Sequence, residues 1–184
     1  MKNVLILSLT IIILASCAPT PPKQEWKKGN LHTHSLWSDG DDFPEMIIKW
    51  YKDHDYQFIA ISDHNTIANE ERWYEMKDRE SKNNTLAKYK KTFGDWVEEK
   101  DSADVTYVRL KTYDEYRLKL ETPDKFTIIK SEEVTSSFER KPVHINVSNI
   151  ENYIPPIKGE SVVDIMQQTL DHVHAQRKET NTRD

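Results

Sequence analysis

The chain has 184 residues, of which 31% are charged and 36% hydrophobic, a balance typical of a soluble globular domain. This composition excludes a disordered tail and a protein with many membrane spans. The formal net charge of −5 also argues against long nucleic acid as a partner, so an anionic substrate would be held by local positive charge such as bound cations.

The first residues predict export. Residues 1–16 carry a basic Lys2 and then an apolar run that is too short to span a bilayer, the pattern of a secretory signal peptide. The "LASC" that ends at Cys17 resembles the lipobox of bacterial lipoproteins, which implies that Cys17 is acylated. We therefore expect a bacterial cell-envelope protein, lipid-anchored to a membrane and facing the periplasm or the exterior, with residues 17–28 as a proline-rich tether. A buried hydrophobic N-terminal helix is the alternative.

The first elements after the tether are predicted to be a strand, a helix and a second strand. Alternation in "KGNLHTH" predicts a short strand over residues 28–34. A helix is expected to begin at Pro44, which suits a first helical position. The apolar run at 58–61 is typical of a strand buried on both faces of a parallel sheet. Residues 67–124 are charged and aromatic and predict a helical insertion, with a break at residues 83 and 84.

Two further strands are expected before the last helix. "KFTIIKSEEV", residues 125–134, predicts a strand that ends in Glu132 and Glu133. "PVHINVSN", residues 142–149, predicts another, in which His144 alternates with apolar residues.

The last predicted element is an amphipathic helix over residues 159–176, with Val163, Met166, Leu170 and Val173 on one stripe, followed by an unstructured tail at 177–184. This order of elements indicates an α/β fold with parallel strands and crossover helices. Such folds place their functional sites at the carboxyl ends of the strands, where the polar clusters of this sequence lie.

The histidines in "HTHSLWSDG" are candidate metal ligands. His32 and His34 are two residues apart, so on a strand they project from one face and can reach one ion. Asp39, in a turn that Gly40 permits, brings a carboxylate back over the strand end. The alternative is a set of polar residues at a strand end, because a divalent ion needs three or four ligands.

More ionisable groups follow the later strands. Asp63 and His64 end the second predicted strand, Glu132 and Glu133 the third, and His144 begins the fourth. Asp63 could instead cap a helix. Groups of this kind in one crevice would repel each other or lose hydration unless a cation neutralised them.

Four motifs together resemble the first motifs of the PHP family, named for its polymerase and histidinol-phosphatase members. They are "HTHSLWSDG", "AISDHNT", "IIKSEEVTS" and "HINVSNI", in the family's order and spacing. The resemblance covers residues 29–176 and implies an α/β fold, the N-terminal part of a distorted (β/α)7 barrel that is incomplete here. It also implies divalent zinc, manganese or iron ions, up to three in the family and fewer in this chain.

The resemblance assigns roles by position. It implies that His32 and His34 bind one ion, and that Glu133, the glutamate before the hydrophobic Val134, bridges this ion to a second one held by His144. It implies further that a third ion is bound by Asp39 and His64, with Asp63 behind the ligands.

The activity implied is metal-assisted hydrolysis of a phosphoester, on a phosphorylated small molecule or a nucleotide end. The family's later motifs, a His-Pro strand end and an Asp-x-His, have no counterpart here, so a truncated chain with weak or absent activity is expected. A non-catalytic lipoprotein that binds a metal or a partner, with an oligomer completing the sheet, is the second hypothesis. An amidohydrolase-like metal hydrolase is the third, since it too begins with H-x-H on a barrel strand.

Overall fold

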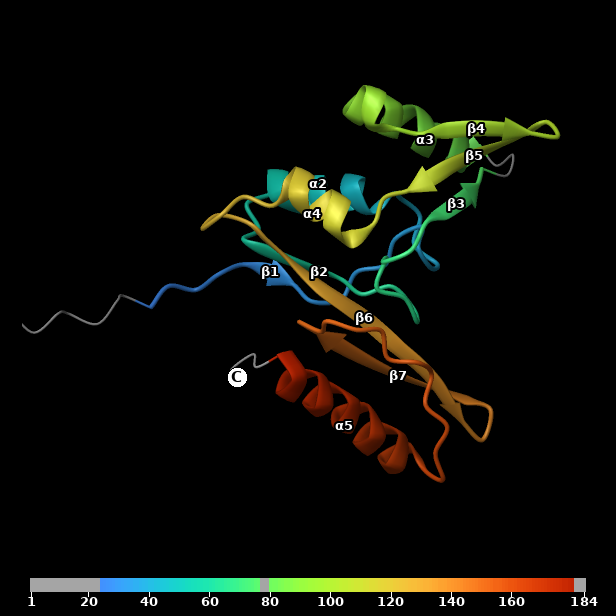
Figure 1. The fold of residues 1–184 in the computed structure, drawn as a ribbon. Helices are drawn as coiled ribbons and strands as arrows, with labels where there is room; N and C mark the ends of the chain where they lie inside the picture. Colours follow the sequence, from blue (N-terminus) through green and yellow to red (C-terminus); the bar gives the residue numbers. More distant parts are fainter. Residues whose placement is uncertain (1–23, 77–79, 181–184) are drawn as a thin grey trace, which may run out of the picture.

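The structure, a computed structural model, describes residues 24–76 and 80–180. A four-stranded sheet of order β1-β2-β6-β7 forms its centre and curls like half a barrel (Figure 1). The strands are β1 (Gly29–Asn30), β2 (Phe58–Ile61), β6 (Thr127–Phe138) and β7 (Lys141–Ser148). With four α-helices in the described part of the chain, the fold is mixed α/β, as the sequence predicted.

Helices α2 (Pro44–Asp53), α4 (Tyr113–Leu120) and α5 (Val162–Thr180) pack on one face of this sheet. Ile128 and Val134 lie six residues apart on β6, so their side chains share a face. Ile128 belongs to a core with helices α2 and α4, and Val134 belongs to a second core with α5. The opposite, inner face therefore carries the intervening odd-numbered side chains of β6.

Helix α2 begins at Pro44 and β2 spans Phe58–Ile61, so both predictions are confirmed. The second residue of α2, Glu45, is fully buried, and neither of its carboxylate oxygens has a hydrogen-bond partner among the described residues. Burial raises the pKa of Glu45 to about 8.

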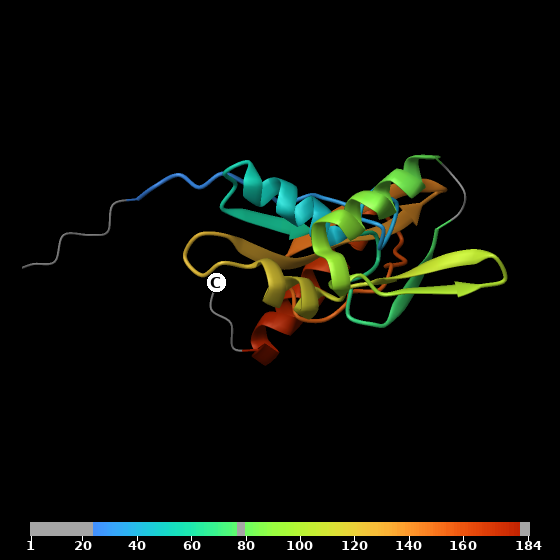
Figure 2. The same cartoon turned by 90° about the horizontal axis from the view of Figure 1, so that it is seen from above.

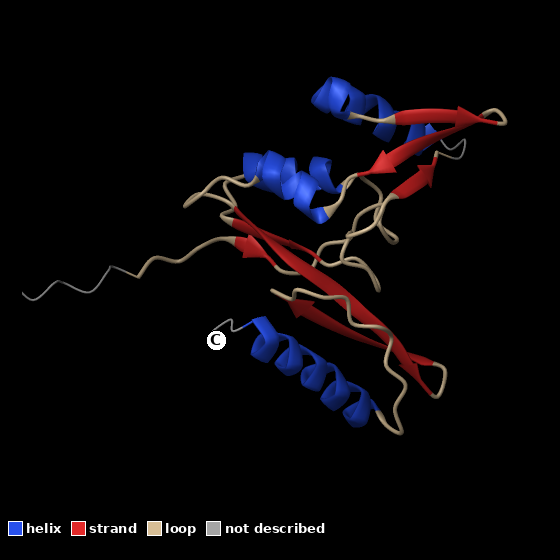
Figure 3. Ribbon diagram, in the orientation of Figure 1, coloured by secondary structure: helices blue, strands red, loops and turns tan. Residues whose placement is uncertain are grey.

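The insertion between β2 and β6 is not helical throughout. It contains a separate antiparallel sheet of order β3-β5-β4, which projects from one end of the molecule (Figure 3). In chain order, the insertion consists of β3 (Arg72–Glu75), α3 (Glu80–Phe93), the 3-10 helix η1 (Gly94–Trp96), β4 (Glu99–Ser102), β5 (Val105–Leu110) and α4.

The predicted helical insertion is therefore wrong over β3, β4 and β5, and α3 runs through the predicted break at residues 83 and 84. Helix propensity is a weak preference that pairing between distant strands overrides. A two-residue loop with positive φ at Ala103 (49°) and Asp104 (64°) joins β4 to β5, which is the geometry of a tight hairpin. The predicted helical character is present in α4, which a capping box between Thr112 and Glu115 starts.

Strands β6 and β7 form an antiparallel hairpin, so the prediction that all strands are parallel is wrong for β7. Glu139 (φ 49°) and Arg140 (φ 65°) form its two-residue turn. Strand β6 continues to Phe138, and Glu132 and Glu133 therefore lie inside the strand and not at its end. Because β2 ends at Ile61, opposite Lys130, Glu133 still lies beyond the carboxyl end of β2.

Helix α5 turns a different face to the core from the one predicted. Ile165 and Thr169 are fully buried, whereas Val163 is 75% exposed and Met166 and Leu170 are each 49% exposed. The predicted stripe thus lies mostly on the outer face of the helix. Residues 177–180 continue α5, so the predicted unstructured tail is wrong for them, and residues 181–184 lie outside the described residues.

The predicted signal peptide, Cys17 and most of the tether also lie outside the described residues; residues 24–28 are exposed and have no regular secondary structure. They lead into β1 (Figure 1), and Figure 2 shows the same segment extending to one side of the sheet and helices. Within residues 24–76 and 80–180, no helix combines the length and the apolar character needed to cross a bilayer.

Candidate metal centre

His32 and His34 follow strand β1, which ends at Asn30 and is shorter than predicted. Hydrogen bonds to the residue after β2 hold the segment between them. The Ser62 amide donates to the Thr33 carbonyl (2.8 Å), and the Thr33 amide donates to Ser62 Oγ (3.1 Å). The two histidine Nε2 atoms consequently lie 3.1 Å apart, so both side chains reach one point although neither residue is in a strand.

A tight turn brings Asp39 back to these histidines. The amides of Ser38 and Gly40 both donate to the Ser35 carbonyl (3.0 and 2.9 Å). A Cβ on Gly40 would lie 2.6 Å from the backbone carbonyl of His34, so glycine is required where the turn passes so close. Asp39 Oδ1 lies 2.7 Å from His34 Nδ1, and this contact holds the pKa of Asp39 below its usual value.

Asp63 lies behind the turn and is buried. It accepts three hydrogen bonds of 2.6 Å, from the amide and hydroxyl of Ser35 and the hydroxyl of Ser38. Burial raises the pKa of Asp63, and these hydrogen bonds oppose the rise. No helix begins at this point, so the interpretation of Asp63 as a helix cap is wrong; it anchors the turn that carries Asp39.

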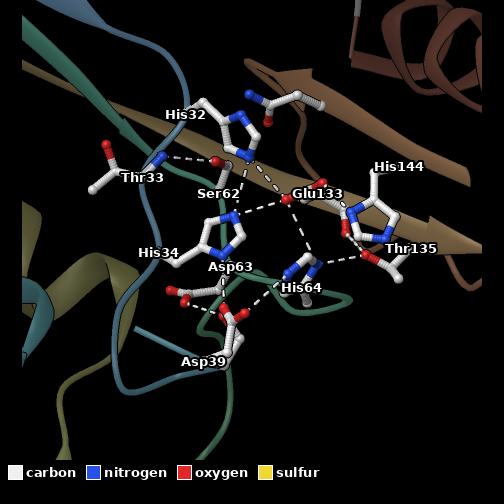
Figure 4. A network of polar contacts seen from close by, with 12 residues as sticks. His32, Thr33, His34, Asp39, Ser62, Asp63, His64, Glu133, Thr135 and His144 are labelled. Atoms are coloured by element: carbon white, nitrogen blue, oxygen red, sulfur yellow. Dashed lines mark hydrogen bonds and ion pairs between the residues drawn. The ribbon is translucent and has the colours of Figure 1, made fainter. Parts of the chain in front are cut away.

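Glu133 is the central acceptor of the site, and its side chain is 3% exposed. Its Oε2 lies 2.8 Å from His32 Nε2 and 2.7 Å from His34 Nε2, and its Oε1 lies 2.7 Å from His144 Nδ1 (Figure 4). Burial works to raise the pKa of Glu133, but the surrounding histidines outweigh it and lower the pKa. Burial likewise works to lower the pKa of His34, and Asp39 and Glu133 together raise it.

The remaining two histidines come from opposite sides of Glu133. His64 follows β2 and makes an isolated parallel bridge with Glu133. Its Nε2 lies 3.5 Å from Asp39 Oδ2, and its Nδ1 lies 2.6 Å from Thr135 Oγ1. His144 lies on β7 opposite Thr135, so its side chain points to the same inner face as Glu133.

The six predicted ligand residues thus meet in one cluster, in which three groups of three could each hold a metal ion. In each group the donor atoms lie within 4.8 Å of one another. The groups are His32, His34 and Glu133; His34, Asp39 and His64; and His64, Glu133 and His144. Imidazole nitrogens with carboxylate oxygens are the donor set that zinc, manganese and iron accept, so the residues fit such ions.

Glu132 does not take part, because its side chain points to the outer face of β6. It is fully buried, its Oε1 accepts a hydrogen bond from the Ile154 amide (3.2 Å), and burial raises its pKa to about 8.

The sequence did not predict several residues that hold the cluster in place. The amide groups of Asn65 and Asn146 bind backbone atoms of Thr135 and Leu31, and the hydroxyls of Ser35, Ser38 and Thr135 contact Asp63 or His64. "SDHN" and "HIN" contain these two asparagines, but side-chain to backbone bonds between distant segments leave no periodic signal.

Comparison with protein-family models, with curated proteins and with solved structures found no match to this chain.

Proposed function

We propose that this chain forms the N-terminal part of a PHP-type barrel and is a metal-dependent hydrolase of phosphoesters. The observation that carries the proposal is the convergence of donors from four separate motifs around Glu133. The three groups of donors correspond to the three ion positions that the motif resemblance implies.

The close contacts within the cluster support a cation. The Nε2 atoms of His32 and His34 are 3.1 Å apart, and both face the same oxygen of Glu133. Neutral imidazoles that direct lone pairs at one point repel each other unless a proton or a metal ion lies between them. Glu133, with one oxygen toward His32 and His34 and the other toward His144, is suited to contact two ions.

The chain's own residues divide the work of such a site. Asp39, Glu133 and the four histidines would hold the ions, and Asp63 would keep Asp39 in place through Ser35 and Ser38. Bound divalent ions would supply positive charge to a phosphate group and would lower the pKa of a water molecule. The His32, Asp39 and His144 side chains are 54%, 66% and 42% exposed, so the cluster is open to a phosphorylated small molecule or a nucleotide end.

Metal analysis together with a hydrolysis assay tests the proposal. We expect the purified chain to retain at least about one ion and to hydrolyse a chromogenic phosphoester with added Mn²⁺. Glu133→Gln should reduce both metal content and activity, the activity by about 100-fold or more, because it removes the central carboxylate. Glu160→Gln, at an exposed site, is the matched control. The proposal would be overturned if the unchanged chain held less than about one ion and Glu133→Gln had the same metal content and activity as Glu160→Gln.

A second candidate is a non-catalytic lipoprotein that binds a metal or a partner. The observation in its favour is the exposed apolar stripe of Val163, Met166 and Leu170 on α5, a surface that a partner or a second copy could cover. Bound metal with no hydrolysis of any phosphoester would favour this candidate.

Hydrolysis of an amide or a lactone in place of a phosphoester would favour the amidohydrolase-like alternative.

A further inference from the structure

His64 belongs to two of the three groups of donors, as do His34 and Glu133, and it faces a different carboxylate with each of its two ring nitrogens. Its Nε2 faces Asp39, with 3.5 Å to Oδ2, while its Nδ1 faces Glu133, with 3.6 Å to Oε2. A neutral imidazole has one protonated and one unprotonated nitrogen, so it can offer a lone pair to only one of the two groups. The position of the His64 proton therefore decides which ion this residue serves.

Thr135 makes the shortest contact to His64, with 2.6 Å between Thr135 Oγ1 and His64 Nδ1. The Thr135 hydroxyl also donates to the carbonyl oxygen of Glu133 (3.2 Å). Since a hydroxyl has a single proton, this bond leaves Oγ1 as an acceptor toward His64. A proton on Nδ1 then has an acceptor, and the Nε2 lone pair remains free.

Thr135 is held in this position by the loop that carries His64. Asn65 Oδ1 accepts a hydrogen bond from the Thr135 amide (2.8 Å), and Asn65 Nδ2 donates to the Thr135 carbonyl (3.2 Å). The side chain next to His64 along the chain thus clamps β6 at Thr135. The distance between the hydroxyl and the imidazole is therefore set by the backbone and does not depend on a bound ion.

We propose that Thr135 is a positioning residue that keeps the His64 proton on Nδ1 and directs the Nε2 lone pair to the group formed with His34 and Asp39. A hydrogen bond on one imidazole nitrogen commonly selects the other as the metal ligand. The assignment of His64 Nε2 as a metal ligand rests on the proposed function. As a consequence, His64 would not be a ligand of an ion held by Glu133 and His144.

Nitrogen NMR of the full, metal-free chain tests the inference directly. Long-range proton–nitrogen correlations at a pH of about 9, where imidazoles are neutral, report which nitrogen carries the proton. The His64 signals are assigned by their loss in His64→Asn. We expect the Nδ1–H form in the unchanged chain and in Thr135→Ser, which keeps the hydroxyl. Thr135→Val should shift the population toward the Nε2–H form, and Thr127→Val, the same change at an exposed position of the same strand, should not.

An Nε2–H form in the unchanged chain would overturn the inference, as would a Thr135→Val spectrum equal to that of the unchanged chain. If Thr135→Val fails to fold, the spectra of the unchanged chain and of Thr135→Ser still decide between the two forms.

Zinc titration then separates this inference from the proposed function. Thr135→Val should weaken one class of zinc site by about 10- to 100-fold, and Thr135→Ser should restore it. Unchanged zinc affinity in Thr135→Val would overturn the ligand part of the inference. If the unchanged chain binds no zinc, manganese or iron, the phosphoesterase proposal fails, while the nitrogen spectrum alone still decides whether Thr135 sets the proton position.

Discussion

Three buried carboxylates illustrate how the surroundings of a residue set its charge. Glu133 is surrounded by histidines and has a lowered pKa, while its neighbour Glu132 points into an apolar core and has a pKa raised to about 8. Glu45, at the start of α2, also has a pKa raised to about 8. Adjacent residues of one strand thus differ in charge because alternation sends them to opposite faces.

The two raised pKa values predict how stability depends on pH. The ordinary value for both groups is 4.5, so between pH 4.5 and about 8 the folded chain binds more protons than the unfolded chain. The free energy of unfolding should therefore fall as pH rises through this window, by up to about 1.4 kcal/mol per pH unit for each group. Denaturant titrations at several pH values measure this slope, on protein from which a chelator has removed metal ions.

Glu45→Gln should reduce that slope, because glutamine stays neutral at every pH, and Glu160→Gln should leave it unchanged. An unaltered slope in Glu45→Gln would show that Glu45 ionises equally in the folded and unfolded chains. Glu45 is the better probe than Glu132, because it lies away from the predicted metal ligands.

At the scale of elements, the length of β6 organises both halves of the fold. Its first residues pair with β2 in parallel, and its later ones pair with β7 in the opposite direction. Glu133 lies where the parallel pairing has just ended, so its side chain meets the segments that leave β1 and β2. Helices α2, α4 and α5 pack on the outer face of the sheet and leave the inner face to the donors.

Helix α5 provides a prediction about its two faces. Ile165→Ala should lower the free energy of unfolding by about 2–5 kcal/mol, because Ile165 is fully buried in the second core. Met166→Ala, the adjacent residue on the exposed stripe, should change it by less than about 0.5 kcal/mol. Denaturant titration of both variants measures the difference. If Met166→Ala lowered the free energy of unfolding more than Ile165→Ala, the stripe predicted from periodicity would face the sheet.

At the scale of the whole molecule, the curled sheet has unequal ends. Strand β1 has two residues and forms one edge, next to the segment that leads in from residue 24, and β7 with eight residues forms the other. The side chains of the site lie on the inner face of the sheet between these edges (Figure 4). The membrane anchor that we propose would join the chain ahead of β1.

Cys17 is the single cysteine of the chain, which makes this anchor testable. In bacterial cells we expect radiolabelled palmitate to be incorporated into the full chain and the protein to be recovered with membranes, since buried acyl chains supply about 0.8 kcal/mol per methylene. Cys17→Ala should abolish both, and Thr20→Ala should change neither. Labelling that persists in Cys17→Ala would contradict the anchor.

The motifs themselves were sufficient to predict which residues gather at the site. His32, His34, Asp39, His64 and His144 were identified from type and position, the motif resemblance selected Glu133 over Glu132, and all six residues meet in one cluster. Helix α2 and strand β2 were predicted because their signals are local: a proline at a helix start and a continuous apolar run. Extended alternation around His144 likewise predicted the side of β7 on which it lies.

Tertiary structure decided the rest, because strand pairing and the choice of the buried helix face depend on contacts that residue type and period do not encode. The sequence by itself determined the α/β class through residue type and period, and the set of donor side chains through residue type, period and the motif resemblance that selected Glu133. Only the folded chain decided that residues 72–75 and 99–110 become a sheet, that β7 runs antiparallel to β6, and that Ile165 and not Met166 faces the core. It also decided that Thr135 reaches His64, since that contact joins residues 71 positions apart.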